Sequence, residues 1–289
     1  MAPTLLLRAP NGETLRVELD SAAPVSTTAT DARFVGGTAA FGGFASDFPT
    51  SNPPPIPTPT PTGFPTSSPP PTGFPTPSPP PSATPTVSPP AAVTTYTLQM
   101  GLLGFQEVAN EAVMPATVVD RFVVDGREVR LAAGVDGYNA TAALIDQWHE
   151  AMLVYAGPPP DRGQVIEALQ QFSFEDSPEG MVVRARPGTG LELLSETTKI
   201  VVEERGAISV PGPGTAIDMV PRHAGARTAY GAVWRLGGQL PDRPGDGANT
   251  YVYIVGTSTA LAGVIFDFEP TVDDPTLLAW LETINLAWL

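Results

Sequence analysis

The sequence of 289 residues has no cysteine, two histidines and a single lysine, Lys199, and these shortages exclude several classes of function. Without cysteine the chain has no disulfide framework, no thiolate metal site and no cysteine nucleophile. With 30 acidic against 15 basic side chains, the net charge of −15 argues against nucleic-acid binding, which depends on clustered Lys and Arg. No uninterrupted apolar run reaches the ~20 residues that a membrane-spanning helix requires.

Proline is abundant instead, with 35 residues, and its distribution divides the chain. Residues 49–93 are rich in Pro, Thr and Ser, and they contain no charged side chain. We therefore predict a short head segment over 1–48 that contains a β-hairpin, a disordered linker over 49–93 and a globular domain over 94–289. The last part is long enough to bury a hydrophobic core.

The proline-rich tract contains two nearly identical decapeptides, at 61–70 and 71–80. Proline fixes φ and removes a hydrogen-bond donor, so the tract is expected to form polyproline II rather than helix or sheet. It is interpreted as a spacer, as a ligand for an aromatic groove of the SH3, WW or EVH1 kind, or as an O-glycosylated stalk of a cell-surface protein. Phe64 and Phe74 favour the ligand, since a spacer needs no aromatic residues.

The head predicts a β-hairpin, with strands at Thr4–Arg8 and Thr14–Glu18 and a turn at Asn11-Gly12. Asn-Gly favours such turns because it accepts positive φ at both central positions. No export signal is visible at the start of the sequence, because Arg8 interrupts the only short apolar run. The Thr/Pro-rich tract favours the cell envelope or the extracellular space, and the missing signal leaves the cytoplasm open.

The pattern over 94–289 predicts an α+β fold with a mostly antiparallel sheet, covered by two mid-chain helices and a C-terminal helix. Apolar residues at spacings of three and four indicate helices over 139–155, 162–171 and 275–288. Asp125-Gly126 predicts a second hairpin, and several strands follow residue 181. The absence of regular βαβ alternation disfavours a Rossmann fold or a barrel.

Residues capable of catalysis are few. His223 lies in an expected loop, and Asp218 or Asp242 is its candidate carboxylate partner in a hydrolase of an unrecognised type. His149 has no second histidine four residues away, so the HExxH zinc arrangement is absent. No spaced calcium-loop pattern occurs either. Nothing in the sequence identifies a metal or a cofactor.

Aromatic residues supply candidate binding positions. Tyr251 and Tyr253 are alternate residues of one expected strand, so they point to the same face, where they either line a groove for sugar or peptide or pack in the core. Together with Phe64 and Phe74 of the tract they are the candidate contacts for a protein or polysaccharide partner.

The sequence therefore favours a non-enzymatic binding or structural module of the cell envelope or surface, carried on a proline-rich stalk. Two alternatives stay open. One is a component of a multi-subunit particle, such as a virion or a secretion apparatus. The other is the hydrolase that would use His223 and a nearby carboxylate.

Overall fold

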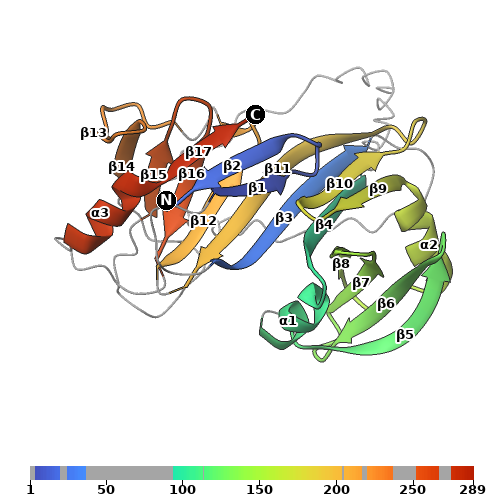
Figure 1. Ribbon diagram of the computed structural model, residues 1–289. Helices are drawn as coiled ribbons and strands as arrows, with labels where there is room; N and C mark the ends of the chain where they lie inside the picture. Colours follow the sequence, from blue (N-terminus) through green and yellow to red (C-terminus); the bar gives the residue numbers. More distant parts are fainter. Residues whose placement is uncertain are drawn as a thin grey trace, which may run out of the picture. The chain divides into compact units, whose positions relative to one another are not determined.

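The computed structural model describes residues 4–19, 25–36, 94–112, 114–203, 205–216, 220–236, 252–266 and 275–289. In these ranges the chain is mostly β, with a 12-stranded antiparallel sheet, two smaller sheets and three short helices (Figure 1). The predicted fold class is therefore wrong, because the sheet is not covered by two mid-chain helices and a long C-terminal helix.

The strands are β1 (Thr4–Arg8), β2 (Thr14–Glu18), β3 (Val25–Gly36), β4 (Thr94–Leu102), β5 (Ala116–Val124), β6 (Arg127–Gly134), β7 (Asn139–Ile145), β8 (His149–Ala156), β9 (Phe172–Ser177), β10 (Gly180–Ala185), β11 (Leu191–Val202), β12 (Gly206–Pro211), β13 (Ala226–Arg227), β14 (Ala232–Leu236), β15 (Val252–Gly256), β16 (Leu261–Ile265) and β17 (Asn285–Trp288). The helices are α1 (Phe105–Ala112), α2 (Arg162–Gln170) and α3 (Pro275–Thr283).

The large sheet has the strand order β13-β14-β15-β16-β12-β11-β3-β4-β8-β7-β6-β5, and every pair in it is antiparallel. A three-stranded sheet has the order β1-β2-β17, and β9 pairs with β10 alone. The described residues of 4–36 and 94–289 all fall within one compact unit.

Strands from the start of the sequence are built into both larger sheets. The strand β3 lies between β11 and β4, and β2 lies between β1 and β17 from the end of the chain (Figure 1). Gly36, the last residue of β3, pairs with Thr94, the first residue of β4. The chain thus leaves the large sheet at Gly36 and returns at the neighbouring position, Thr94, after 57 intervening residues. The linker predicted over 49–93 falls inside this connection and lies outside the described residues.

The helix predicted over 139–155 is wrong, because these residues form the hairpin β7–β8. Five residues in a row are buried in each strand, since one face contacts the core beneath α2 and the other face contacts α1. A strand that is buried on both faces does not alternate between apolar and polar residues, so its sequence resembles that of a buried helix.

The helix predicted over 275–288 is only partly correct. It ends at Thr283, whose hydroxyl donates to the carbonyl of Trp280 at 2.7 Å. The next residues form β17, in which Leu286 pairs with Val17 of the head hairpin. Pairing with β2 therefore overrides the helical periodicity of the last residues. The helix predicted over 162–171 is present as α2.

Both predicted hairpins are present. At the second turn Asp125 and Gly126 have φ of 50° and 81°, as the sequence pattern requires. In the first turn Gly12 has φ of 96°, and it is the only residue of its Asn-Gly pair with a positive φ. Its amide donates to the carbonyl of Ala9 at 2.9 Å.

Two large hydrophobic cores lie against the large sheet. The first is formed by β1, β2, β17 and α3 with strands β11–β12 and β14–β16, and it includes Leu15, Val17, Ile200 and Ile284. The second is formed by α2, β9 and β10 with strands β3–β8, and it includes Phe34, Leu98, Val165 and Phe172. A third, small cluster joins α1 to the other face of β7 and β8.

Candidate functional site

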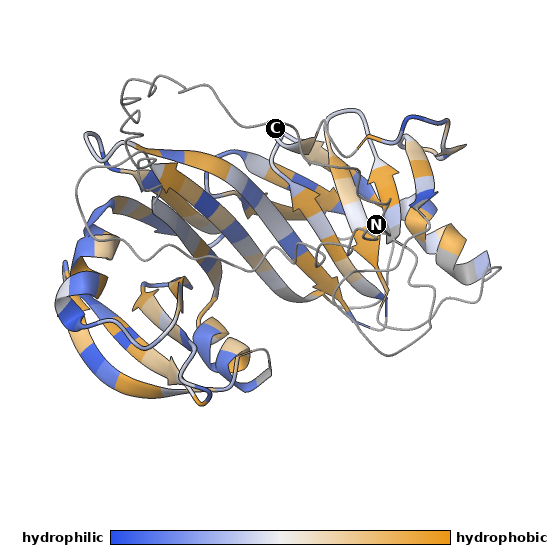
Figure 2. Cartoon of the chain, turned by 180° about the vertical axis from the view of Figure 1, so that it is seen from behind, coloured by the Kyte–Doolittle hydropathy of each residue, from blue (hydrophilic) through white to orange (hydrophobic). Residues whose placement is uncertain are grey.

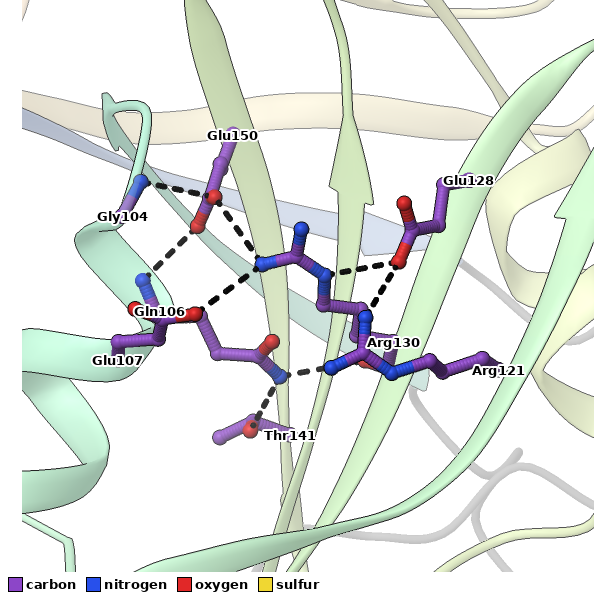
Figure 3. A network of polar contacts seen from close by, with 8 residues as sticks. All are labelled: Gly104, Gln106, Glu107, Arg121, Glu128, Arg130, Thr141 and Glu150. Carbon is purple, nitrogen blue, oxygen red and sulfur yellow. Dashed lines mark hydrogen bonds and ion pairs between the residues drawn. The ribbon is translucent and has the colours of Figure 1, made fainter.

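A buried carboxylate fixes the start of α1. Glu150 lies on β8, and its side chain is 1% exposed. Its two oxygens accept the backbone N–H groups of Gly104 and Gln106, each at 2.9 Å (Figure 3). The first amides of a helix have no partner within the helix, and they carry a partial positive charge. Glu150 therefore holds α1 against the sheet.

The Gln106 side chain extends the same contact into the sheet. It is buried, and its amide nitrogen donates to the carbonyl of Arg130 at 3.2 Å and to the hydroxyl of Thr141 at 3.1 Å (Figure 3). Its Oε1 atom is buried without a hydrogen-bond partner. The amide thus ties α1 to β6 and β7.

Charged residues surround this contact on the outer face of β6. Arg130 donates to Glu128 at 2.9 Å and lies 3.5 Å from Glu107 and 3.9 Å from Glu150 (Figure 3). The hydrogen bond to Glu128 raises the pKa of Arg130 and lowers the pKa of Glu128. Arg121 donates to the same Glu128 oxygen at 3.0 Å. Every charge in the group has an opposite partner, so the network is suited to holding elements together.

His149 and Asp176 form a second buried pair, between β8 and β9. The imidazole Nδ1 lies 2.7 Å from Oδ1 of Asp176, and the two side chains are 9% and 4% exposed. The other Asp176 oxygen accepts the backbone N–H groups of Trp148 and His149, at 2.7 and 3.3 Å. Asp176 thus fixes both the imidazole and the turn before β8. A carboxylate that orients an imidazole is also part of hydrolytic triads, but those need a nucleophile at the second ring nitrogen.

A third enclosed carboxylate contacts the head hairpin. Glu196 on β11 is 6% exposed, and its Oε2 atom accepts the backbone N–H of Asn11 at 3.0 Å. Burial is the largest cause that raises the pKa of Glu196 to about 7. The hydrogen bond from Asn11 opposes this shift, and the nearby charge of Glu13 adds to it.

The catalytic candidates from the sequence are only partly described. The side chain of His223 is exposed, and its backbone carbonyl accepts the indole N–H of Trp234 at 2.7 Å. Asp218 and Asp242 lie outside the described residues. Their approach to His223 therefore stays a prediction.

The structure places one aromatic candidate in the core. Tyr253 is 4% exposed, and its ring packs edge-on against Phe266 with the centroids 5.4 Å apart. This is the core position that the sequence left as the alternative to a groove. Phe64, Phe74 and Tyr251 lie outside the described residues.

Exposed apolar side chains gather beside α1, where β4 ends and β8 begins. Leu102 and Leu103 are each about half exposed, at 51% and 53%, and the amide of Leu103 donates to the carbonyl of Trp148 at 3.3 Å. Trp148 is 37% exposed, and Val108, one turn into α1, is also exposed. Clusters of this kind often mark contact surfaces.

Sequence reasoning missed the three enclosed carboxylates. Glu150 was assigned to a helix, where an acidic residue usually faces solvent, and Asp176 lies in a segment without a strong pattern. Neither position has a clear local signal, since Glu150 precedes the apolar run 151–155 and Glu196 lies between Ser195 and Thr197. Their partners are 185 and 44 to 46 residues away in the sequence, and no local pattern reveals such contacts.

In the described ranges no three His, Cys, Asp or Glu side chains are close enough together to hold a metal ion. None of the helices that the structure describes has the length and apolar character needed to cross a membrane. No family model, curated protein or solved structure gives a significant match to the chain.

Proposed function

We propose that the chain is a non-enzymatic binding or structural module of the cell envelope or surface, whose folded unit presents the Pro/Thr/Ser-rich tract to a protein partner. The pairing of Gly36 with Thr94 carries this proposal. Neighbouring antiparallel strands are usually joined by two to five residues, and connections above ~15 residues are usually functional. Here 57 residues leave the sheet and return to the same place.

The attachment of both ends has a consequence for binding. A tract anchored at two neighbouring residues cannot separate the head from the rest of the fold, because the head strands belong to the same unit. It acts as a displayed loop. The expected polyproline II conformation costs little entropy on binding, and it fits the aromatic grooves of SH3, WW and EVH1 domains. Phe64 and Phe74 occur once in each decapeptide and supply apolar contacts.

The enclosed carboxylates support a non-enzymatic role. Glu150, Asp176 and Glu196 each accept a backbone N–H of a connecting segment. Their hydrogen-bonding capacity is thus used to fix a helix start, a turn and a hairpin tip. Glu150 and Asp176 in particular hold α1 and the turn before β8 on the large sheet.

The test is excision of the tract. Replacing residues 37–93 by Asn-Gly joins β3 to β4 through a two-residue hairpin, which their pairing allows. We expect the circular dichroism to show the same β content. We also expect stability to rise by about 3 kcal/mol, because closing a long loop costs entropy. Binding to a panel of purified SH3, WW and EVH1 domains, measured by calorimetry, should be lost.

A full-length variant with Phe64→Ser and Phe74→Ser is the matched control, since it keeps the length and the prolines. We expect it to weaken binding to the same panel while stability stays unchanged. Failure of the native chain to bind any of these domains would contradict the proposal. Binding of soluble wall polysaccharide instead would assign the tract to the other class of partner.

A multi-subunit particle component is the second candidate, and β5, an edge strand of the large sheet, favours it, because among the described strands it pairs with β6 alone. It is nine residues long and carries exposed Val119 and Val123. Apolar and polar bands follow one another along the strands of this part of the sheet (Figure 2). Open edges of this length readily pair with another chain. Light scattering on the native chain should then give an oligomer that Val123→Lys disrupts, and a strict monomer would reject this candidate.

A further inference from the structure

Glu196 occupies a core position in β11. Residues 196, 198, 200 and 202 are buried while their neighbours in the strand are more exposed, so these four share one face. Ile200 and Val202 on this face belong to the core beneath the head hairpin. A carboxylic acid therefore stands in a row that otherwise packs against the three-stranded sheet.

The carboxyl group is enclosed between two segments. The tip of the head hairpin contributes the backbone N–H of Asn11, 3.0 Å from Oε2. On the other side lies Gly212, whose amide donates to the backbone carbonyl of Glu196 at 3.0 Å. Any side chain at position 212 would clash with the carboxyl oxygen Oε1. Water has little access, because Glu196 is 6% exposed.

The charges around the site favour the neutral carboxyl. None of the ion pairs among the described residues includes Glu196. Arg184 of β10 lies beside Gly12 of the tip, but its guanidinium pairs with Glu175 of β9. Arg8 of the hairpin also pairs with Glu175.

Within the described ranges, the charge that acts on the pKa of Glu196 is that of Glu13, which lies two residues after Asn11 in the tip and is itself acidic. Ala32, which pairs with Glu196 in the sheet, and Gly212, which contacts its side chain, carry no charge. An ionised carboxylate that is buried without a cation is costly, and one backbone N–H compensates only part of that cost.

We propose that Glu196 is the proton-binding residue of a pH-sensitive clasp: the hairpin tip Ala9–Glu13 lies closed on β11 when Glu196 is neutral, and it opens when Glu196 is ionised. The step is the loss of one proton from the carboxyl group to solvent, after which water replaces the tip around the carboxylate. The raised pKa of Glu196, about 7, agrees with this geometry. The closed tip binds the proton more tightly than an open, hydrated one, so rising pH favours opening.

The opening is local. The strands β1 and β2 remain anchored, because Leu15 and Val17 are fully buried in the core. Two backbone bonds connect the tip region to the β9–β10 hairpin, from Arg8 N–H to the Glu179 carbonyl at 2.9 Å and from Val183 N–H to the Pro10 carbonyl at 3.0 Å. The bond to Pro10 belongs to the tip, so we expect it to open together with the bond to Asn11.

Amide hydrogen exchange on the full chain tests the clasp. We expect the protection of the Asn11 amide, corrected for the intrinsic exchange rate, to fall by ~10- to 30-fold between pH 5.5 and 8.5, given a carboxyl pKa that differs by about two to two and a half units between the closed and open tip. The Val183 amide should follow it. Amides in the centre of β2 should keep constant protection.

Variants separate the clasp from a general effect of pH. Glu196→Gln, a neutral side chain of the same shape, should keep the Asn11 amide protected at both pH values. Glu192→Gln, an exposed acid on the same strand, should behave like the native chain. Glu13→Gln should make the loss of protection smaller, because removal of the neighbouring negative charge lowers the pKa of Glu196 in the closed tip and narrows the pKa difference between the closed and the open tip.

Two results of the hydrogen-exchange experiment would overturn the clasp. One is an unchanged Asn11 protection across the pH range in the native chain. The other is a pH-dependent loss of protection that persists in Glu196→Gln. A third test needs no variant: the pKa of the Glu196 carboxyl is measured in the native chain by carbon-detected NMR titration. A midpoint near 4.5 would also reject the proposal.

Discussion

The imidazole Nδ1 of His149 lies 2.7 Å from Oδ1 of Asp176, and this contact joins the large sheet to the two-stranded sheet. The same carboxylate accepts two backbone N–H groups from the turn before β8. One side chain thus fixes the position of β9, the turn and the ring. The cost of disturbing it should be large, because buried partners would be left without hydrogen bonds.

We expect Asp176→Asn to destabilise the fold by about 1–3 kcal/mol. Asparagine keeps one acceptor oxygen and replaces the other with an NH2 donor, so it cannot accept both the two backbone N–H groups and an N–H at the imidazole Nδ1. Urea denaturation followed by tryptophan fluorescence measures the change. Glu179→Gln, an exposed acid in the β9–β10 turn, should change stability by less than about 0.5 kcal/mol. Equal effects of the two substitutions would refute the structural role of the pair.

Glu150→Ala should release α1 from the sheet. The N–H groups of Gly104 and Gln106 would lose their acceptor in a buried position, at a cost of about 2–4 kcal/mol. Exchange of the Gln106 amide should then accelerate before global unfolding. The matched variant is Glu107→Gln, whose exposed carboxylate pairs with Arg130 at 3.5 Å and should contribute little. A protected Gln106 amide in Glu150→Ala would show that the carboxylate does not hold the helix.

The contribution of Glu196 to the free energy of unfolding should fall as pH rises from about 4.5 to 7. Its pKa is raised from 4.5 to about 7 on folding, so the folded chain binds more protons than the unfolded chain in this window. The stabilising contribution is complete below about 4.5 and is lost as pH rises through about 7. Allowing for solvent screening, the effect is on the order of 1–2 kcal/mol. Melting temperatures of the native chain and Glu196→Gln at several pH values measure it, and parallel curves would contradict the assignment.

Local sequence patterns predicted the elements whose cause is local. Asp125-Gly126 identified its hairpin because positive φ at both positions is a property of those two residues. The helix over 162–171 was predicted from its apolar face, and Asp161 caps it through a hydrogen bond from the Gln164 amide at 2.8 Å. Such features need no knowledge of distant parts of the chain.

The elements that the sequence patterns did not predict depend on contacts between distant segments of the chain. The strands β7 and β8 are buried by α1 on one face and by the α2 core on the other, and neither layer is evident in their own sequence. Residues 285–288 could be assigned to β17 only once β2, from the start of the chain, is known to pair with them. The enclosed carboxylates were not predicted for the same reason, since the donors to Glu150 and Glu196 come from other elements.

Gly212→Ala should displace the Glu196 carboxyl from the hairpin tip. The added methyl would clash with Oε1, Cγ and the carboxyl carbon of Glu196, and the backbone of residue 212 is fixed by its bond to the Glu196 carbonyl. The side chain must therefore move, and its hydrogen bond from Asn11 is lost. We expect a loss of about 1–2 kcal/mol at pH 5.5, where the native tip is closed, and a smaller loss at pH 8.5.

Gly214→Ala is the control for this substitution, because a side chain at position 214 meets no neighbouring atom. It should leave stability within about 0.5 kcal/mol of the native value at both pH values. Urea denaturation of the native chain and both variants at pH 5.5 and 8.5 compares them directly. An equal loss of free energy at both pH values would contradict this expectation. It would show that the added methyl strains the backbone at position 212, and that the effect of the substitution does not depend on the protonation of Glu196.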